Sequence, residues 1–230
     1  SDPRLEFASV RHVQVADRVE YVARLARAWV KLARTPRADR RLALVLSDYP
    51  ARGGRTGYAV GLDSVESVLE ILTLLRAEGY DTGARDWRAA DIESLLHRQQ
   101  LFLRCGKVIV LLQPDRAGAY HDTAAEPHPD YVETYRRLRE DEKIDALIHL
   151  GTHGTLEWLP GKALALSAEC WPEKVLGPMP IIYPFIVNNP GEAVQAKRRL
   201  SAVVIGHLTP PLGQAGLNGT MAEMEGLIEE

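Results

Sequence analysis

Short apolar runs of strand length alternate along this chain with stretches in which apolar residues recur every three or four positions. The clearest runs are 41–47 (RLALVLS), 107–113 (KVIVLLQ), 144–150 and 181–187. Continuous apolar runs are typical of strands buried on both faces, and the intervening period is typical of helices. Strands that alternate with helices predict an α/β fold. We therefore expect a mostly parallel, doubly wound sheet of the flavodoxin or Rossmann type, with flanking helices.

Several segments carry helix signals. Within the first forty residues, a stripe at helical spacing predicts a helix that faces a core and ends at Thr35-Pro36; the stripe comprises Val15, Val19, Val22, Ala26, Trp29 and Ala33. The basic residues between them fit a solvated face, or a docking arm for an acidic partner. Residues 63–66 resemble a capping box, and Gly79 would close that helix. Pro184 points to an edge strand or a bulge.

The predicted elements divide the chain into three parts. We expect a helical lead-in over 1–40, an α/β core over 41–213 and a C-terminal helical tail over 214–230. Ligands of doubly wound sheets bind beyond the carboxyl ends of the strands. Two loops, 48–62 and 149–162, follow predicted strands and are therefore the first places to look for a site.

Composition narrows the class of protein. The 230 residues are 46% hydrophobic and 26% charged, with a net charge of −3, which suits a globular chain and excludes a disordered one. Only two cysteines occur, so a reducing cytoplasm fits better than secretion. No apolar run reaches the roughly 18–20 residues of a membrane helix, and no signal peptide is visible. The charge balance argues against nucleic-acid binding.

The densest group of reactive side chains lies in 149–162 (HLGTHGTLEWLPGK), where His149, His153 and Glu157 fall within nine residues. The glycines between them argue against one continuous helix. Glu157 would open a single helical turn capped by Thr155, which favours its ionised form. Imidazoles beside a carboxylate could bind a divalent metal or accept protons. A purely structural strand end and turn explains the same residues, and both interpretations stay open.

Other candidates are more dispersed. His121 lies in a polar loop, where a surface histidine is the more common explanation, and Glu192 could complete a capping box with Asn189. A basic patch follows on the same predicted helix and could hold carboxylates or simply face solvent; it comprises Gln195, Lys197, Arg198 and Arg199.

Taken together, these segments resemble the family of the cobaltochelatase large subunit CobN and the magnesium chelatase H subunit. The matching stretches are 44–50 with 61–63, 110–116 (VLLQPDR), 120–122 (YHD), 145–162 and 183–211. The last two are long and unusual in composition. The Glu157–Lys162 motif and the Tyr183–Val187 motif look more like the cobalt branch.

The resemblance implies ATP-dependent insertion of Co²⁺, the substrate metal, into hydrogenobyrinic acid a,c-diamide during aerobic cobalamin synthesis. ATP and Mg²⁺ would belong to separate AAA+ partners of the CobS and CobT type, and this sequence has no P-loop motif. We expect catalytic roles for His149, His153 and Glu157, with metal binding by these three and His121. The expected contacts to substrate carboxylates come from Glu192, Gln195, Lys197 and Arg198.

Two alternatives remain. One is a magnesium chelatase H-type subunit that binds protoporphyrin IX, and the other is a tetrapyrrole- or metal-binding module without insertion activity. The family subunit is several times longer, so we expect a fragment that is inactive alone. The stretch between Tyr80 and Cys105 is also shorter than the family pattern.

Overall fold

The computed structural model describes residues 12–47, 57, 62–97, 101–116, 122–151, 154–164, 166–184 and 190–206. Within these ranges the helices are α1 (Ala16–Arg34), α2 (Ser64–Ala77), α3 (Ala89–Leu96), α4 (Pro129–Glu140), α5 (Trp171–Leu176) and α6 (Pro190–Leu200). The strands are β1 (Leu42–Leu46), β2 (Phe102–Cys105), β3 (Val108–Leu112), β4 (Ala146–Leu150), β5 (Ile181–Pro184) and β6 (Val203–Ile205).

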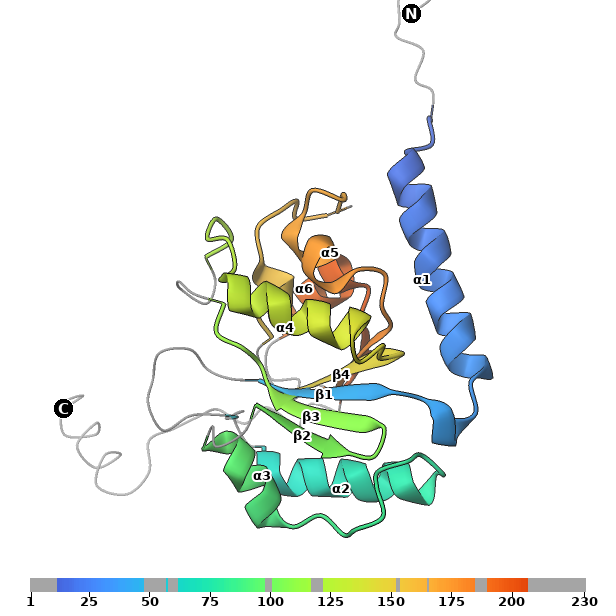
Figure 1. The fold of residues 1–230 in the computed structure, drawn as a ribbon. Helices are drawn as coiled ribbons and strands as arrows, with labels where there is room; N and C mark the ends of the chain where they lie inside the picture. Colours follow the sequence, from blue (N-terminus) through green and yellow to red (C-terminus); the bar gives the residue numbers. More distant parts are fainter. Residues whose placement is uncertain are drawn as a thin grey trace, which may run out of the picture.

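The six strands form one sheet in the order β2-β3-β1-β4-β5-β6. All neighbouring pairs are parallel except β2 with β3, which form an antiparallel hairpin at one edge. Helices α2 and α3 cover one face, and α4, α5 and α6 cover the other (Figure 1). The predicted doubly wound α/β class is therefore confirmed.

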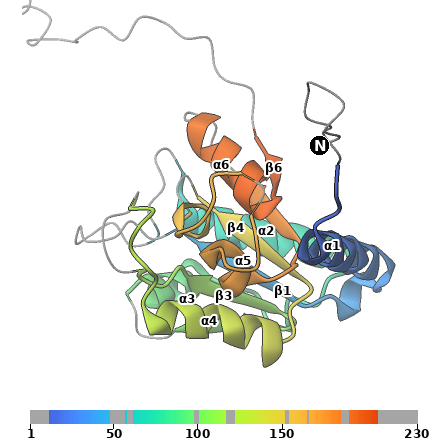
Figure 2. The ribbon, with the colours of Figure 1, turned by 90° about the horizontal axis from the view of Figure 1, so that it is seen from above.

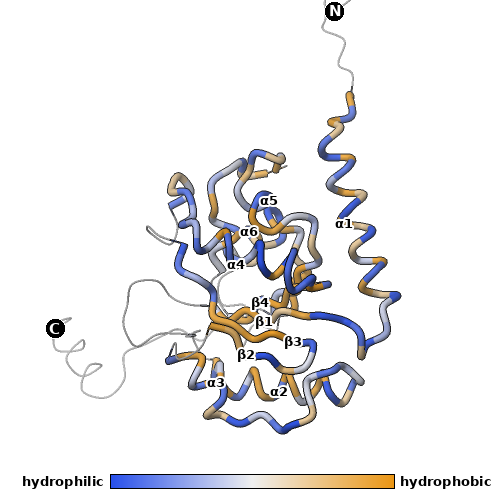
Figure 3. Tube along the Cα trace, viewed as in Figure 1, coloured by the Kyte–Doolittle hydropathy of each residue, from blue (hydrophilic) through white to orange (hydrophobic). Residues whose placement is uncertain are grey.

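The central strands are the most apolar part of the chain (Figure 3). Every residue of β1 and β4 is buried, as are the first four residues of β3. Strands covered on both faces need apolar side chains on both, which is why these three elements read as continuous runs in the sequence. They supply a rigid platform whose carboxyl ends carry the candidate residues.

Two strands and one position in the sheet differ from expectation. β2 and β6 are not predicted by the sequence pattern, because they have only four and three residues. Pro184 predicts an edge or a bulge for β5, but this strand lies between β4 and β6. Proline is tolerated there because the pairing of β5 with β4 ends at Ile182, so Pro184 is paired only with β6.

The first helix also corrects a prediction. α1 ends at Arg34 with Thr35 as its C-cap, as expected, but it lies to one side of the sheet and its covering helices (Figure 2). Val15, Val19 and Val22 are 58%, 53% and 63% exposed. This part of the stripe therefore faces away from the core, whereas Trp29 further along is half-buried. Instead, Arg18 pairs with Glu173, and the Tyr21 hydroxyl donates to the carbonyl of Gly177 at 3.2 Å.

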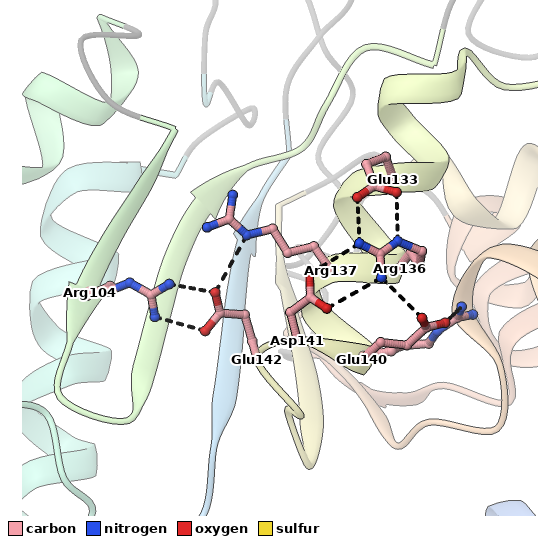
Figure 4. A network of polar contacts seen from close by, with 8 residues as sticks. Arg104, Glu133, Arg136, Arg137, Glu140, Asp141 and Glu142 are labelled. Atoms are coloured by element: carbon pink, nitrogen blue, oxygen red, sulfur yellow. Dashed lines mark hydrogen bonds and ion pairs between the residues drawn. The ribbon is translucent and has the colours of Figure 1, made fainter.

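Polar contacts tie the hairpin edge to the far end of α4. Arg104 of β2 makes a bidentate pair with Glu142, while Arg136 on α4 contacts Glu133, Glu140 and Asp141 (Figure 4). Most of these side chains are solvent-exposed, so each pair contributes at most about 1 kcal/mol. They lie at the opposite end of β4 from His149, and the site must be held by other contacts.

The remaining boundary predictions are met in part. The N-cap of α2 is Asp63, whose carboxylate accepts from the amide of Glu66 at 3.0 Å, and Gly79 follows the helix with φ +82°. α6 begins at Pro190, as predicted, while its proposed cap Asn189 lies outside the described residues. The proposed tail over 214–230 lies outside them as well.

Candidate functional site

The sheet reverses its winding between β1 and β4, which is where ligands bind in doubly wound folds. At their carboxyl ends, the amide of Ser47 donates to the carbonyl of Leu150 at 2.9 Å. The next residue, Gly151, has φ +142°, and a Cβ there would collide with the Ser47 hydroxyl. A glycine is therefore required at this crossing. The chain then enters the segment that carries Glu157.

His149 lies on β4 with its side chain 2% exposed. Its Nε2 lies 2.7 Å from Oε1 of Gln113, and its ring packs on Tyr183 with centroids 4.7 Å apart. Among the described residues, its Nδ1 has no hydrogen-bond partner although it is buried. Burial lowers the pKa of His149 to about 3, so its imidazole is neutral at physiological pH. A neutral imidazole offers one nitrogen lone pair.

Glu157 lies in the single 3-10 turn Leu156–Trp158 and is 1% exposed. The predicted turn is present, but Thr155 does not cap it through its side chain; its hydroxyl instead pairs with that of Tyr131 at 2.8 Å. Oε1 of Glu157 accepts from the Tyr183 hydroxyl at 3.4 Å, and Oε2 has no hydrogen-bond partner in the described part of the chain.

The charge state of Glu157 differs from expectation. Burial raises its pKa to about 7, and the nearby charge of Glu192 acts in the same direction. The sequence predicts an ionised carboxylate at a helix N-terminus, but desolvation outweighs the dipole of one short turn. A carboxyl group that titrates near neutral pH can both accept and release a proton.

Gly154 provides the space that this carboxyl group occupies. A Cβ at residue 154 would lie 2.5 Å from Oε2 of Glu157, 2.7 Å from its Oε1 and 2.8 Å from the hydroxyl of Tyr183. These approaches are closer than a Cβ tolerates, so any larger residue here would have to displace the Glu157 carboxyl group or the Tyr183 hydroxyl.

Helix α6 holds the same loop from the other side. Oε2 of Glu192, which is buried, accepts from the indole N–H of Trp158 at 2.8 Å. About two turns further along the helix, the buried guanidinium of Arg199 donates to the main-chain carbonyls of Glu157, Leu159 and Lys162. Both residues are therefore on the buried face of α6, where Glu192 holds the Trp158 side chain and Arg199 holds the backbone around Glu157.

Arg116 is a second buried arginine that binds main-chain oxygens. It donates to the carbonyl of Trp158 at 3.1 Å and to that of Ala125 at 3.0 Å. Burying an arginine is expensive unless its donors are satisfied. In Arg116 and Arg199, hydrogen bonds to main-chain carbonyls replace the water that burial removes. These bonds hold the backbone of the 157–162 segment in place.

The predicted site residues are only partly brought together. His149 and Glu157 both contact Tyr183, and Glu192 reaches the loop through Trp158. Gln195 is half-buried and Lys197 and Arg198 are exposed on α6, so their role toward a substrate stays a prediction. His121 and His153 lie outside the described residues, within which no group of three metal-ligating side chains occurs.

Four site residues have roles that the sequence does not predict: Gln113, Arg116, Tyr183 and Arg199. Arg199 belongs by sequence to the basic patch, but its side chain is buried against the loop. Gln113 carries a usable signal, since it is the first polar residue after a buried strand, at the sheet end where ligands bind. The contacts of Arg116, Tyr183 and Arg199 join segments that are distant in the sequence, so the sequence pattern does not predict them.

Known proteins match this chain over most of its length. The family model CobN/Magnesium Chelatase matches residues 2–101 and 100–230, two segments that meet near the shortened stretch before Cys105. Over 276 aligned residues the chain is 40% identical to the aerobic cobaltochelatase subunit CobN of Pseudomonas aeruginosa, covering 93% of this chain and 22% of that protein. The magnesium-chelatase H subunit of Chlorobaculum parvum is 30% identical, with 94% and 22% covered.

A solved structure agrees with these relatives. The catalytic subunit of cobaltochelatase from Mycobacterium tuberculosis superposes with a TM-score of 0.75 at 33% identity, covering 94% of this chain and 24% of that one. The chain thus spans about a quarter or less of the length of the proteins that it matches. Within the described residues, no helix is long and apolar enough to cross a membrane.

Proposed function

Because the chain belongs to the CobN/Magnesium Chelatase family, we propose that it forms part of the large, tetrapyrrole-binding subunit of an ATP-dependent cobaltochelatase. The substrates would be Co²⁺ and hydrogenobyrinic acid a,c-diamide. The greater identity to the cobalt relative, 40% against 30% for the magnesium relative, supports the choice of metal. ATP and Mg²⁺ would be bound by AAA+ partner subunits of the CobS and CobT type in the cytoplasm.

The observation that carries this proposal is a pair of buried, unsatisfied acceptors beside one tyrosine. Nδ1 of His149 and Oε2 of Glu157 have no hydrogen-bond partner among the described residues, and Tyr183 contacts both side chains. Buried polar atoms are normally satisfied, so such exceptions indicate a place where a ligand or an ion completes the site.

The two groups suit different parts of metal insertion. A metal ion must lose water ligands before it enters the ring, and the neutral imidazole of His149 offers a lone pair that can replace one of them. Two ring N–H groups must lose their protons as the metal enters. Glu157 suits that step, because its pKa of about 7 lets it accept a proton at physiological pH.

The remaining candidates would act around this pair. His121 and His153 would add metal ligands, and Gln195, Lys197 and Arg198 would contact the carboxylates of the tetrapyrrole. Arg prefers such planar partners, and the exposed positions of Lys197 and Arg198 leave both side chains accessible to a substrate.

Absorbance titration of the chain with tetrapyrroles tests this function. We expect hydrogenobyrinic acid a,c-diamide to bind more tightly than protoporphyrin IX; the opposite order would assign the chain to the magnesium branch.

In a full-length subunit supplied with Co²⁺, ATP and its AAA+ partners, Glu157→Gln should lower insertion at least about 100-fold. Lys143→Gln, at the opposite end of β4, serves as the control. Normal insertion by Glu157→Gln would remove Glu157 from the mechanism, and corrin binding without insertion by the wild-type subunit would indicate a binding module.

A further inference from the structure

One side-chain oxygen of Gln113 contacts both the His149 ring and the segment that carries Glu157. Gln113 follows β3 directly and is 1% exposed. Its Oε1 lies 2.7 Å from Nε2 of His149 and also accepts from the main-chain amide of Thr155 at 3.3 Å. The side chain crosses the end of β1, since β1 lies between β3 and β4 in the sheet.

These two contacts determine where the hydrogen on the His149 ring lies. A main-chain amide is always a donor, so the Gln113 atom facing Thr155 must be the oxygen and not the nitrogen. That oxygen has no hydrogen to give, so Nε2 of His149 must donate. A neutral imidazole has one N–H group, so Nδ1 carries no hydrogen and its lone pair is available to a ligand.

We propose that Gln113 is a positioning residue that holds His149 in the tautomer with hydrogen on Nε2 and thereby keeps Nδ1 open for a metal ion. The tautomer follows from the hydrogen bonds of Gln113 alone, whereas the use of Nδ1 toward a metal rests on the proposed function. The same oxygen anchors Thr155, two residues before Glu157, and so sets the spacing between imidazole and carboxyl group.

Three variants of the 230-residue chain test the proposal. Gln113→Met has nearly the same length and removes the acceptor, so the ring hydrogen is no longer held on Nε2. Gln113→Glu keeps an acceptor oxygen at the same place and should preserve the tautomer. Gln14→Met makes the same replacement at an exposed position before α1 and is the matched control.

The first measurement is a long-range ¹H–¹⁵N correlation spectrum of chain labelled at histidine, with the His149 ring identified by its loss in His149→Gln. We expect Nε2 to carry the hydrogen in the wild type, in Gln113→Glu and in Gln14→Met. In Gln113→Met the hydrogen should move wholly or partly to Nδ1. Hydrogen on Nδ1 in the wild type, hydrogen on Nδ1 alone in Gln113→Glu, or an unchanged ring in a folded Gln113→Met would overturn the proposal.

The second measurement is titration with Co²⁺ alone, followed by its visible absorption. Replacing a residue that orients a ligand typically weakens metal binding about 10- to 100-fold, so we expect a loss of at least about tenfold in Gln113→Met and none in Gln14→Met. If the wild type does not bind Co²⁺, metal binding by this chain is refuted while the spectra still decide the tautomer. If the wild type binds and Gln113→Met binds equally well, the role of Gln113 is refuted and the proposed function stands.

Discussion

The guanidinium of Arg199 donates to the main-chain carbonyl of Glu157, while the carboxyl group of the same glutamate accepts from Tyr183. The buried arginine thus directs its donors to the backbone of the loop. That arrangement explains how a glutamate with a pKa raised to about 7 can lie close to a buried cation.

Arg199→Met should destabilise the fold by about 2–4 kcal/mol, because three carbonyl groups of the 157–162 loop lose their donor. Urea unfolding measures this difference. The neighbouring Arg198→Met is the matched control, since Arg198 is exposed, and it should change stability by less than about 0.5 kcal/mol. Equal effects of the two substitutions would contradict the assigned role.

Glu157 should make the fold less stable as pH rises through the acid range. Its pKa is raised from 4.5 to about 7 on folding, so between these values the unfolded chain releases a proton that the native chain keeps. The resulting loss of unfolding free energy reaches about 3 kcal/mol above pH 7 and vanishes below pH 4.5. Subtracting the profile of Glu157→Gln from that of the wild type isolates this contribution; a flat difference would show that the carboxyl group titrates normally.

His149 should act in the opposite direction. Its pKa is lowered from 6.5 to about 3, so below pH 6.5 the unfolded chain takes up a proton that the native chain does not. Stability should therefore fall as the pH falls, by roughly 1.4 kcal/mol per pH unit between 6.5 and 3. The comparison is the unfolding profile of His149→Gln, in which this acid-side loss should be absent. If the loss persists there unchanged, other groups cause it.

Gly154→Ala should displace the Glu157 carboxyl group, because the new Cβ would lie 2.5 Å from Oε2. We expect destabilisation of about 1–3 kcal/mol, typical of overpacking in a buried region. The same substitution made in a Glu157→Ala background should have a smaller effect, because only the Tyr183 hydroxyl, at 2.8 Å, is left within clashing distance. Additive effects in this double-mutant cycle, measured by urea unfolding, would place the conflict elsewhere.

The strands that position the site are predictable because burial on both faces leaves a continuous apolar run, as in β1, β3 and β4. The pattern misses the hairpin strand β2, although Gly106 between a short alternating segment and the apolar run of β3 is a hairpin signal. The outward stripe of α1 is not foreseeable, since helical periodicity shows that a helix has an apolar side but not which neighbour covers it.

Within the site, spacing correctly places His149 at the end of a strand and Glu157 on a turn. Their protonation does not follow from spacing, because a pKa depends on desolvation by side chains that are distant in sequence. The roles of Gln113 and Tyr183 depend on strand order, which places the ends of β3 and β5 on either side of the β1–β4 pair.

The passage of the Gln113 side chain over the end of β1 has a consequence for how firmly the site is held. The hydrogen bond to His149 joins residues 36 positions apart on strands that flank β1, so its geometry depends on the pairing of all three strands. Arg199 adds contacts to residues 37 to 42 positions earlier. The tautomer of His149 is therefore fixed only while β3, β1 and β4 stay paired, and local opening of β1 would release it.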